Sequence, residues 1–190
     1  MAAPALKYIT PKEYLQMEIL AYEKHEYFDG QVVAMAGTRE AHNRIVANVI
    51  GELHAHLKGK TCDVFPSDLR IATPSSNSYT YPDVSIVCGD IKKKDGEFDT
   101  CTNPTVIIEV MSDSTRDRDM GYKFFYYQQI PSLKEYILID SLTYFTETIY
   151  RQPDDSWKFD TVNDINSAVT VRSIDITLPL ADIYYKVSLP

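Results

Sequence analysis

Two apolar runs in the middle of the chain, Tyr81–Val87 and Val106–Met111, predict a pair of β-strands. Both runs are rich in β-branched residues, and the segment between them is charged and turn-rich at Lys92–Gly96. If the strands pair antiparallel, the start of the first lies opposite the end of the second. Asp83 stands at that start and Glu109 at that end. The pattern therefore predicts that two carboxylates meet at one edge of a sheet.

Two helices are expected before these strands. Thr10-Pro11-Lys12-Glu13 has the residues of a capping box with proline at the first helical position, and the helix is expected to run to about Tyr22. Between about Ala41 and Leu57, apolar residues recur on one helical face. This second helix is expected to pack against the sheet.

A third helix is expected at roughly Arg116–Gln129, directly after the Glu109 strand. Asp119, Lys123 and Tyr127 are spaced four apart on it and share one face. The apolar run Glu135–Asp140 follows in strand–helix–strand order. A right-handed crossover of this kind places Glu135–Asp140 parallel to the Glu109 strand.

The remaining elements are short strands and turns. Glu26–Ala34 contains Asp29-Gly30 between apolar residues, which predicts a hairpin. Cys62–Phe65 and Leu69–Ala72 are expected to be strands, and Thr73–Thr80 is expected to be a loop. The C-terminal part predicts four further strands, at Thr143–Arg151, Trp157–Val162, Thr170–Val171 and Ile174–Pro179.

This order of elements predicts an α/β or α+β fold, in which a mixed β-sheet is flanked by helices and extended by an antiparallel β-meander. We find no repeat or domain boundary, so residues 1–190 are expected to form a single domain. The composition, 44% hydrophobic and 24% charged, is that of a soluble protein. No apolar run is long enough to span a membrane, and Met1–Thr10 lacks the features of a signal peptide. We therefore expect a cytoplasmic protein without membrane contact.

The cysteines and the charge narrow this picture. Cys62, Cys88 and Cys101 are odd in number and show no CxxC spacing, which predicts reduced thiols. The net charge of −8 is unlike that of avid nucleic-acid binders, whose affinity comes largely from basic contacts to phosphate. Local basic patches such as Lys92–Lys94 could still touch a nucleic-acid backbone, although such patches are more often solvated loops.

The expected meeting of Asp83 and Glu109 requires a compensating partner. Two carboxylates about 4 Å apart repel by roughly 4 kcal/mol at an effective dielectric near 20. A proton, a neighbouring cation or a bound divalent metal could relieve this repulsion, and two hard oxygen ligands suit Mg²⁺ or Mn²⁺ better than Zn²⁺. The alternative is that Asp83 only starts a turn after Pro82, while Glu109 faces solvent.

Two more polar residues have open roles. Glu26 precedes the Asp29-Gly30 turn and is either a third acid of the site or an exposed strand residue. His42 lies near the start of the second helix, where a lone histidine is more often a hydrogen-bonded structural residue than a ligand.

Taken together, these motifs resemble the PD-(D/E)XK nuclease superfamily, whose core is a helix, a three-stranded meander, a helix and a further strand. More narrowly, the chain resembles the restriction-endonuclease-type family known as a bacterial domain of unknown function. The resemblance covers nearly the whole length, through Thr10–Leu15, Tyr27–Gly37, His42-Asn43, Tyr81–Val84, Ile108–Ser112, Lys123-Phe124 and Ile130–Tyr136.

The resemblance implies a restriction-endonuclease-like fold and a Mg²⁺-dependent endonuclease, with Mn²⁺ as a substitute, that cuts DNA as a homodimer. It implies that Asp83 and Glu109 are metal ligands, with the Val110 carbonyl as a possible third. The strict motif has lysine two residues after the acid, where this chain has Met111. The resemblance therefore assigns the lysine to the following helix, as Lys123, and matches Glu26 to an acid often supplied by the N-terminal part. Asp83, Glu109, Lys123 and Glu26 are thus the expected catalytic residues.

Two other functions remain open from the sequence. The acidic charge and the missing lysine in the strand favour a binding or assembly module that keeps the nuclease fold with little or no catalysis. A carboxylate-based hydrolase of small phosphoesters would act on nucleotides and leave polymers intact. Metal binding measured beside plasmid nicking separates these alternatives.

Overall fold

The computed structural model describes residues 8–35, 37–94 and 100–190. Within these residues, six strands form the larger sheet, in the order β11-β10-β9-β8-β6-β3. Strands β8 and β9 run parallel, whereas the pairs on either side of them are antiparallel, so the predicted mixed sheet and its parallel pair are confirmed. The strands are β3 (Cys62–Pro66), β6 (Val84–Cys88), β8 (Val106–Met111), β9 (Glu135–Asp140), β10 (Thr146–Arg151) and β11 (Trp157–Val162).

The register of β6 and β8 brings the two acids of the sequence pattern together. Val84 pairs with Ile108 and Ser85 with Ile107, in antiparallel direction. One step beyond Val84, Asp83 therefore lies opposite Glu109. The predicted pairing is confirmed, while the expected turn residues Asp95 and Gly96 lie outside the described residues.

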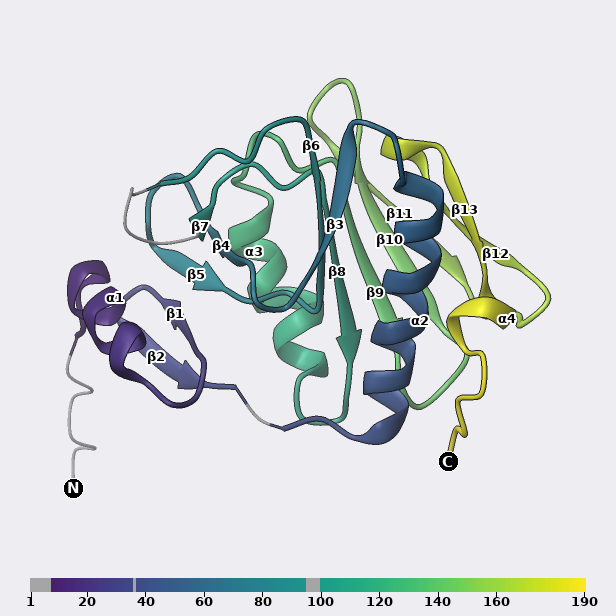
Figure 1. Ribbon diagram of the computed structural model, residues 1–190, viewed down its shortest axis with the longest axis horizontal. Coiled ribbons are helices and arrows are strands. Elements are labelled where there is room, and N and C mark those ends of the chain that lie inside the picture. Colours follow the sequence, from purple (N-terminus) through teal and green to yellow (C-terminus); the bar gives the residue numbers. More distant parts are fainter. Residues whose placement is uncertain (1–7, 36, 95–99) are drawn as a thin grey trace.

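The two faces of the larger sheet are covered by different elements (Figure 1). Ile108 and Val110 of β8 pack with Ile45 and Val49 of the long helix α2 (Glu40–Leu57). On the same face lie the hairpin of β12 (Ala168–Val171) and β13 (Ile176–Pro179), the short 3₁₀-helix η2 (Arg172–Ile174) and α4 (Leu180–Ile183).

The opposite face of β8 points toward the third helical segment. Ile107 and Met111 pack with Tyr127 of α3 (Phe124–Tyr127). Because side chains alternate along a strand, Glu109 points to this same face. The predicted helix after β8 is present, but its first part, η1 (Arg118–Lys123), is a π-helix that leads into α3.

A smaller sheet lies beside the larger one. In the described part of the chain it has five strands, ordered β2-β1-β5-β4-β7. Their bounds are β1 (His25–Phe28), β2 (Gln31–Ala34), β4 (Arg70–Ala72), β5 (Ser78–Thr80) and β7 (Thr100–Cys101). The predicted β1–β2 hairpin is confirmed, and its turn residues Asp29 and Gly30 have φ of 42° and 89°, as the tight turn between twisted strands requires. The prediction of a loop through Thr80 is wrong, because Ser78–Thr80 pairs with both β1 and β4.

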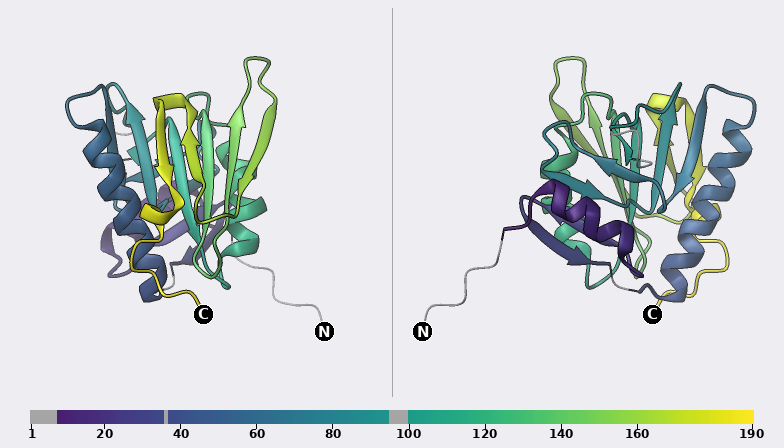
Figure 2. Two further views of the ribbon diagram at one scale, coloured as in Figure 1. Left: turned by 90° about the vertical axis from the view of Figure 1, so that its right-hand side faces the viewer. Right: turned by 60° about the vertical axis from the view of Figure 1, so that its left-hand side comes forward.

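Helix α1 (Pro11–Leu20) rests on the smaller sheet (Figure 2). Its predicted capping box is present, with the Thr10 side chain accepting from the Glu13 amide and Glu13 accepting from the Thr10 amide. Tyr14 packs against Tyr27 and Tyr79, with ring centroids 5.1 Å and 5.5 Å away. None of the helices in the described residues combines the length and the apolar composition that a membrane span requires.

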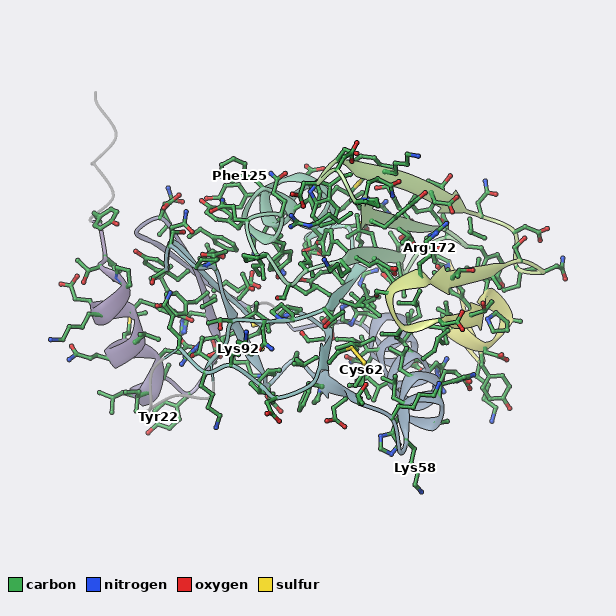
Figure 3. All side chains as sticks on the ribbon, turned by 90° about the horizontal axis from the view of Figure 1, so that it is seen from above. Tyr22, Lys58, Cys62, Lys92, Phe125 and Arg172 are labelled. Atoms are coloured by element: carbon green, nitrogen blue, oxygen red, sulfur yellow. A yellow bond between two sulfur atoms is a disulfide. The ribbon has the colours of Figure 1, made fainter. Side chains whose placement is uncertain are left out.

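The expectation of three reduced thiols is wrong for two of them. Cys62 and Cys88 form a disulfide, visible as the sulfur–sulfur bond at Cys62 in Figure 3. Cys62 of β3 and Cys88 of β6 are direct cross-strand partners. They become neighbours only through the register in which the two strands pair. Cys101 is a free, buried thiol, as expected.

Breaking this disulfide is expected to lower the free energy of unfolding by about 3 kcal/mol, because it closes a chain segment with a sequence separation of 26 residues. Urea unfolding of the wild type with and without dithiothreitol, beside Cys62→Ser, measures this. Dithiothreitol should lower the free energy of unfolding of the wild type toward that of the variant and should leave the value of the variant unchanged. A wild type that is equally stable in both conditions would show that the bond contributes nothing.

Candidate active site

A cavity of about 60 Å³ lies where the two sheets, α2 and η1 meet. Its walls carry residues far apart in the sequence: Glu26 of β1, His42 of α2, Asp83 before β6, Glu109 of β8 and Lys123 of η1. The remaining lining residues are Met35, Thr38, Tyr81, Val110, Thr115, Arg118 and Asp119. The fold thus brings together the four expected catalytic residues and the expected third ligand, Val110.

Asp83 and Glu109 fix each other through the neighbouring backbone. The amide of Asp83 donates to Oε2 of Glu109 at 3.3 Å, and the amide of Val110 donates to Oδ2 of Asp83 at 2.8 Å. Glu109 is 3% exposed, so the alternative in which it faces solvent is excluded. The two carboxylates meet at the sheet edge as the strand pattern predicted.

The Lys123 ammonium group lies among described carboxylates of three different elements. Its Nζ is 2.9 Å from Oε1 of Glu109, 3.0 Å from Oε1 of Glu26 and 3.3 Å from Oδ1 of Asp119. Lys123 is 6% exposed and Glu26 2%, so Glu26 is not the exposed strand residue that the sequence left open. Lys123 therefore cross-links β1, β8 and η1 at the cavity.

Two further side chains complete this cluster. The hydroxyl group of Tyr127 donates to Oε1 of Glu109 at 3.0 Å and lies 3.0 Å from Oγ1 of Thr80, which can donate to it in turn. Arg118 reaches from η1 to within 3.8 Å of Oε2 of Glu26 and is partly exposed. Glu109 is thus held by a lysine, a tyrosine and a backbone amide.

The electrostatic balance of the cavity is negative. Among the described residues that line it, four carboxylates, Glu26, Asp83, Glu109 and Asp119, face two permanent cations, Arg118 and Lys123. Burial raises the pKa of Glu109; attraction by Lys123 lowers it, and repulsion by Asp119, Asp83 and Glu26 raises it again, leaving the pKa well above its usual range. Even with Glu109 protonated, three carboxylates face the two cations, so the site holds more negative charge than its own cations neutralise.

Lys123 remains charged in this environment. Burial alone lowers the pKa of its ammonium group, but the carboxylates of Glu109, Glu26 and Asp119 outweigh burial and hold the pKa well above its ordinary value. The lysine is thus a permanent cation of the site.

His42 of α2 also lines the cavity. Its Nε2 is 3.2 Å from Oδ2 of Asp83, and the residue is 6% exposed. A ring hydrogen on Nε2 suits this contact, because a carboxylate only accepts hydrogen bonds. A residue that the sequence favoured as structural thus contacts one of the two central acids.

The oxygen ligands present suit a Mg²⁺ or Mn²⁺ ion with an incomplete protein shell. The contacts described for the Asp83 carboxylate engage Oδ2, which leaves Oδ1 available to a metal. Across the described residues, no three His, Cys, Asp or Glu side chains form a complete metal cage. Mg²⁺ does not need one, since it is commonly bound through one or two carboxylates plus waters and substrate phosphate. The donor set therefore fits Mg²⁺ better than Zn²⁺.

Asp119 and Tyr127 belong to the cluster and were not among the site residues expected from the sequence. The signal was present, because both share a helical face with Lys123 at a spacing of four. What the sequence did not contain is the target of that face, which depends on how η1 packs against β1 and β8.

The chain matches the family model Uma2, described as "Putative restriction endonuclease", over residues 11–181. Two proteins of Synechocystis sp. are similar to it. The first, "Uncharacterized protein slr1290", is 38% identical over 149 residues, which cover 78% of this chain and 77% of that protein. The second, "Uncharacterized protein sll1609", is 36% identical over 157 residues, which cover 83% and 89%.

A solved structure shares the fold. It is the crystal structure of "a putative nuclease belonging to DUF820" from Anabaena variabilis, with a TM-score of 0.76 at 16% sequence identity. The match covers 93% of this chain and 97% of that protein. The restriction-endonuclease-like fold expected from the sequence is confirmed.

Proposed function

The chain belongs to the Uma2 family, whose description is "Putative restriction endonuclease", and from this membership we propose that it is a Mg²⁺-dependent endonuclease that hydrolyses phosphodiester bonds in DNA. One observation carries the proposal. Asp83 and Glu109, which are 26 residues apart in sequence, are joined through backbone hydrogen bonds beside a cavity with excess negative charge. A bound divalent metal would balance the charge that Arg118 and Lys123 leave uncompensated.

In this proposal Asp83 and Glu109 hold Mg²⁺, with the Val110 carbonyl as a possible third ligand. Held by these residues, the metal would supply polarisation of a phosphate oxygen and a lower pKa for a bound water molecule. Asp83 contributes Oδ1, while its Oδ2 is held by the Val110 amide. Glu109 contributes Oε2, because Lys123 and Tyr127 both contact Oε1.

Lys123 acts in two ways in this scheme. Its ammonium group fixes the orientation of Glu109, and its charge offsets the negative charge that accumulates when a phosphate enters. Glu26 orients Lys123 from the opposite side, at 3.0 Å. Arg118, partly exposed at the same cavity, is placed to contact a phosphate oxygen of the substrate.

Nicking of supercoiled plasmid DNA by the purified protein tests this function. We expect relaxed and linear products with Mg²⁺ or Mn²⁺ and none with EDTA, because Asp83 and Glu109 act in this proposal by holding the divalent metal. Calorimetry with the same metals gives the binding that should accompany cleavage. Metal binding with nicking supports the proposal, and nicking that persists in EDTA would refute it.

A second candidate is a binding or assembly module without catalysis. One observation favours it: the Lys123 ammonium group contacts three carboxylates of the protein within 3.3 Å, so the lysine is engaged within the protein. In that case neither metal binding nor nicking should be measurable. Cleavage of small phosphoesters without nicking would instead indicate a hydrolase of nucleotides. The homodimer and the cytoplasmic location expected from the sequence stay predictions.

A further inference from the structure

A second cavity, of about 140 Å³, lies beside the candidate active site. Thr38 and His42 line both cavities and form the wall between them. The other lining residues are Gly37, Arg39, Ser112, Asp113, Ser114, Ser141 and Leu142. The second cavity is therefore positioned to receive a group that neighbours the one in the active site.

The N-terminus of α2 opens at this cavity. Helix α2 has 18 residues, and its N-cap residue Arg39 makes no side-chain capping hydrogen bond. Its first intrahelical bond runs from the Asn43 amide to the Arg39 carbonyl, at 3.1 Å. The amides of Glu40, Ala41 and His42 thus have no partner among the described residues. Free amides and the positive end of the helix dipole together favour an anion.

His42, in the wall of this cavity, supplies a second and independent observation. Its Nε2 contacts Asp83, whereas its buried Nδ1 has no hydrogen-bond partner within the described residues. A buried polar nitrogen without a hydrogen-bond partner costs free energy and is rare in native structures. With the ring hydrogen on Nε2, Nδ1 accepts a hydrogen bond, and in the charged ring it donates one; a sugar hydroxyl or a phosphate-bound water can serve as either partner.

We propose that this cavity binds the phosphate of the nucleotide next to the one that is cleaved. The deduction rests on the proposed nuclease function and specifies how the substrate backbone crosses the protein, from the acidic cavity over His42 to the start of α2. Arg39 is exposed at the rim and makes no ion pair in the described part of the chain, so its guanidinium group is available for the phosphate. Asp113, also exposed at the rim, opposes the anion and limits its affinity.

Titration of the ¹⁵N-labelled protein with inorganic phosphate, without divalent metal, tests the subsite by NMR. We expect saturable shifts of the Arg39, Glu40, Ala41 and His42 amides. Arg39→Ala should weaken binding roughly tenfold, as expected for loss of a charge-assisted contact, and Asp113→Asn should strengthen it. Lys58→Ala is the matched control, because it removes one positive charge at the other end of the same helix, where the side chain projects from the molecule (Figure 3).

The outcomes separate the subsite from the nuclease proposal, since no turnover is required. Absent shifts, or equal weakening by Arg39→Ala and Lys58→Ala, would overturn the subsite even if the protein cuts DNA. Shifts that appear with Mg²⁺ and not with phosphate would overturn it too. A deoxydinucleotide and a ribodinucleotide, each 5′-phosphorylated, then identify the source: binding of either supports the subsite, and binding of neither contradicts it.

Discussion

Replacing Asp83 with asparagine is expected to lower Mg²⁺-dependent phosphodiester cleavage at least about 10³-fold, equivalent to roughly 4 kcal/mol of transition-state stabilisation. The substitution keeps the shape of the side chain but removes the charge that the metal requires. Glu109→Gln is expected to have a similar effect for the same reason. Single-turnover cleavage of an end-labelled duplex at saturating Mg²⁺ measures both losses.

Glu135→Gln is the matched control for these variants. Glu135 is a buried carboxylate of β9, 2% exposed, and does not line the acidic cavity. Its replacement makes the same chemical change in a neighbouring strand and should leave the cleavage rate within a few-fold of wild type. If Asp83→Asn turned over as fast as the wild type, Asp83 could not be a metal ligand, because its neutral amide does not supply the negative charge that the metal requires.

Replacing Lys123 with methionine is expected to lower the free energy of unfolding by about 3–5 kcal/mol at pH 7. The change leaves Glu109, Glu26 and Asp119 buried without the cation that each of them contacts. Urea unfolding followed by circular dichroism gives the difference. Lys60→Met, at an exposed position, should stay within about 0.5 kcal/mol of wild type.

The pH dependence of the same measurement has a defined sign. The pKa of Glu109 is raised in the folded state, so its contribution to stability is largest at low pH and is lost as the pH rises through that pKa. Without Lys123 the pKa of Glu109 rises further, so the stability deficit of Lys123→Met should shrink as the pH falls through the wild-type pKa of Glu109. The pKa of Lys123 is also raised, so the contribution of Lys123 to stability should be lost only above the ordinary lysine range. A deficit that is constant with pH would argue against the buried cluster.

Much of the site followed from local sequence patterns. The apolar runs around Asp83 and Glu109 specified two strands, and their antiparallel pairing was enough to bring the acids together. The spacing of Asp119, Lys123 and Tyr127 specified a common helical face. The helical face follows from residue spacing within one helix. The meeting of the two acids follows from the antiparallel direction of two strands that are consecutive in the predicted order.

The features that were missed depend on contacts between elements. The Cys62–Cys88 disulfide exists because the β3–β6 register places these residues opposite each other, and no spacing rule encodes that register. Strand β5 is short and polar, and it is stabilised by pairing with β1 and β4. The burial of Glu26 likewise arises because the smaller sheet packs against η1 through Lys123.

The central claim is that Asp83 and Glu109 together hold a divalent metal. Anomalous diffraction from crystals soaked in Mn²⁺ tests it most directly, because the manganese signal locates the ion without reference to activity. The account predicts one peak between the two carboxylates, at a ligand distance of about 2.1 Å from an oxygen of each. Soaked crystals with no peak at this position, or with the ion bound only elsewhere, would contradict it.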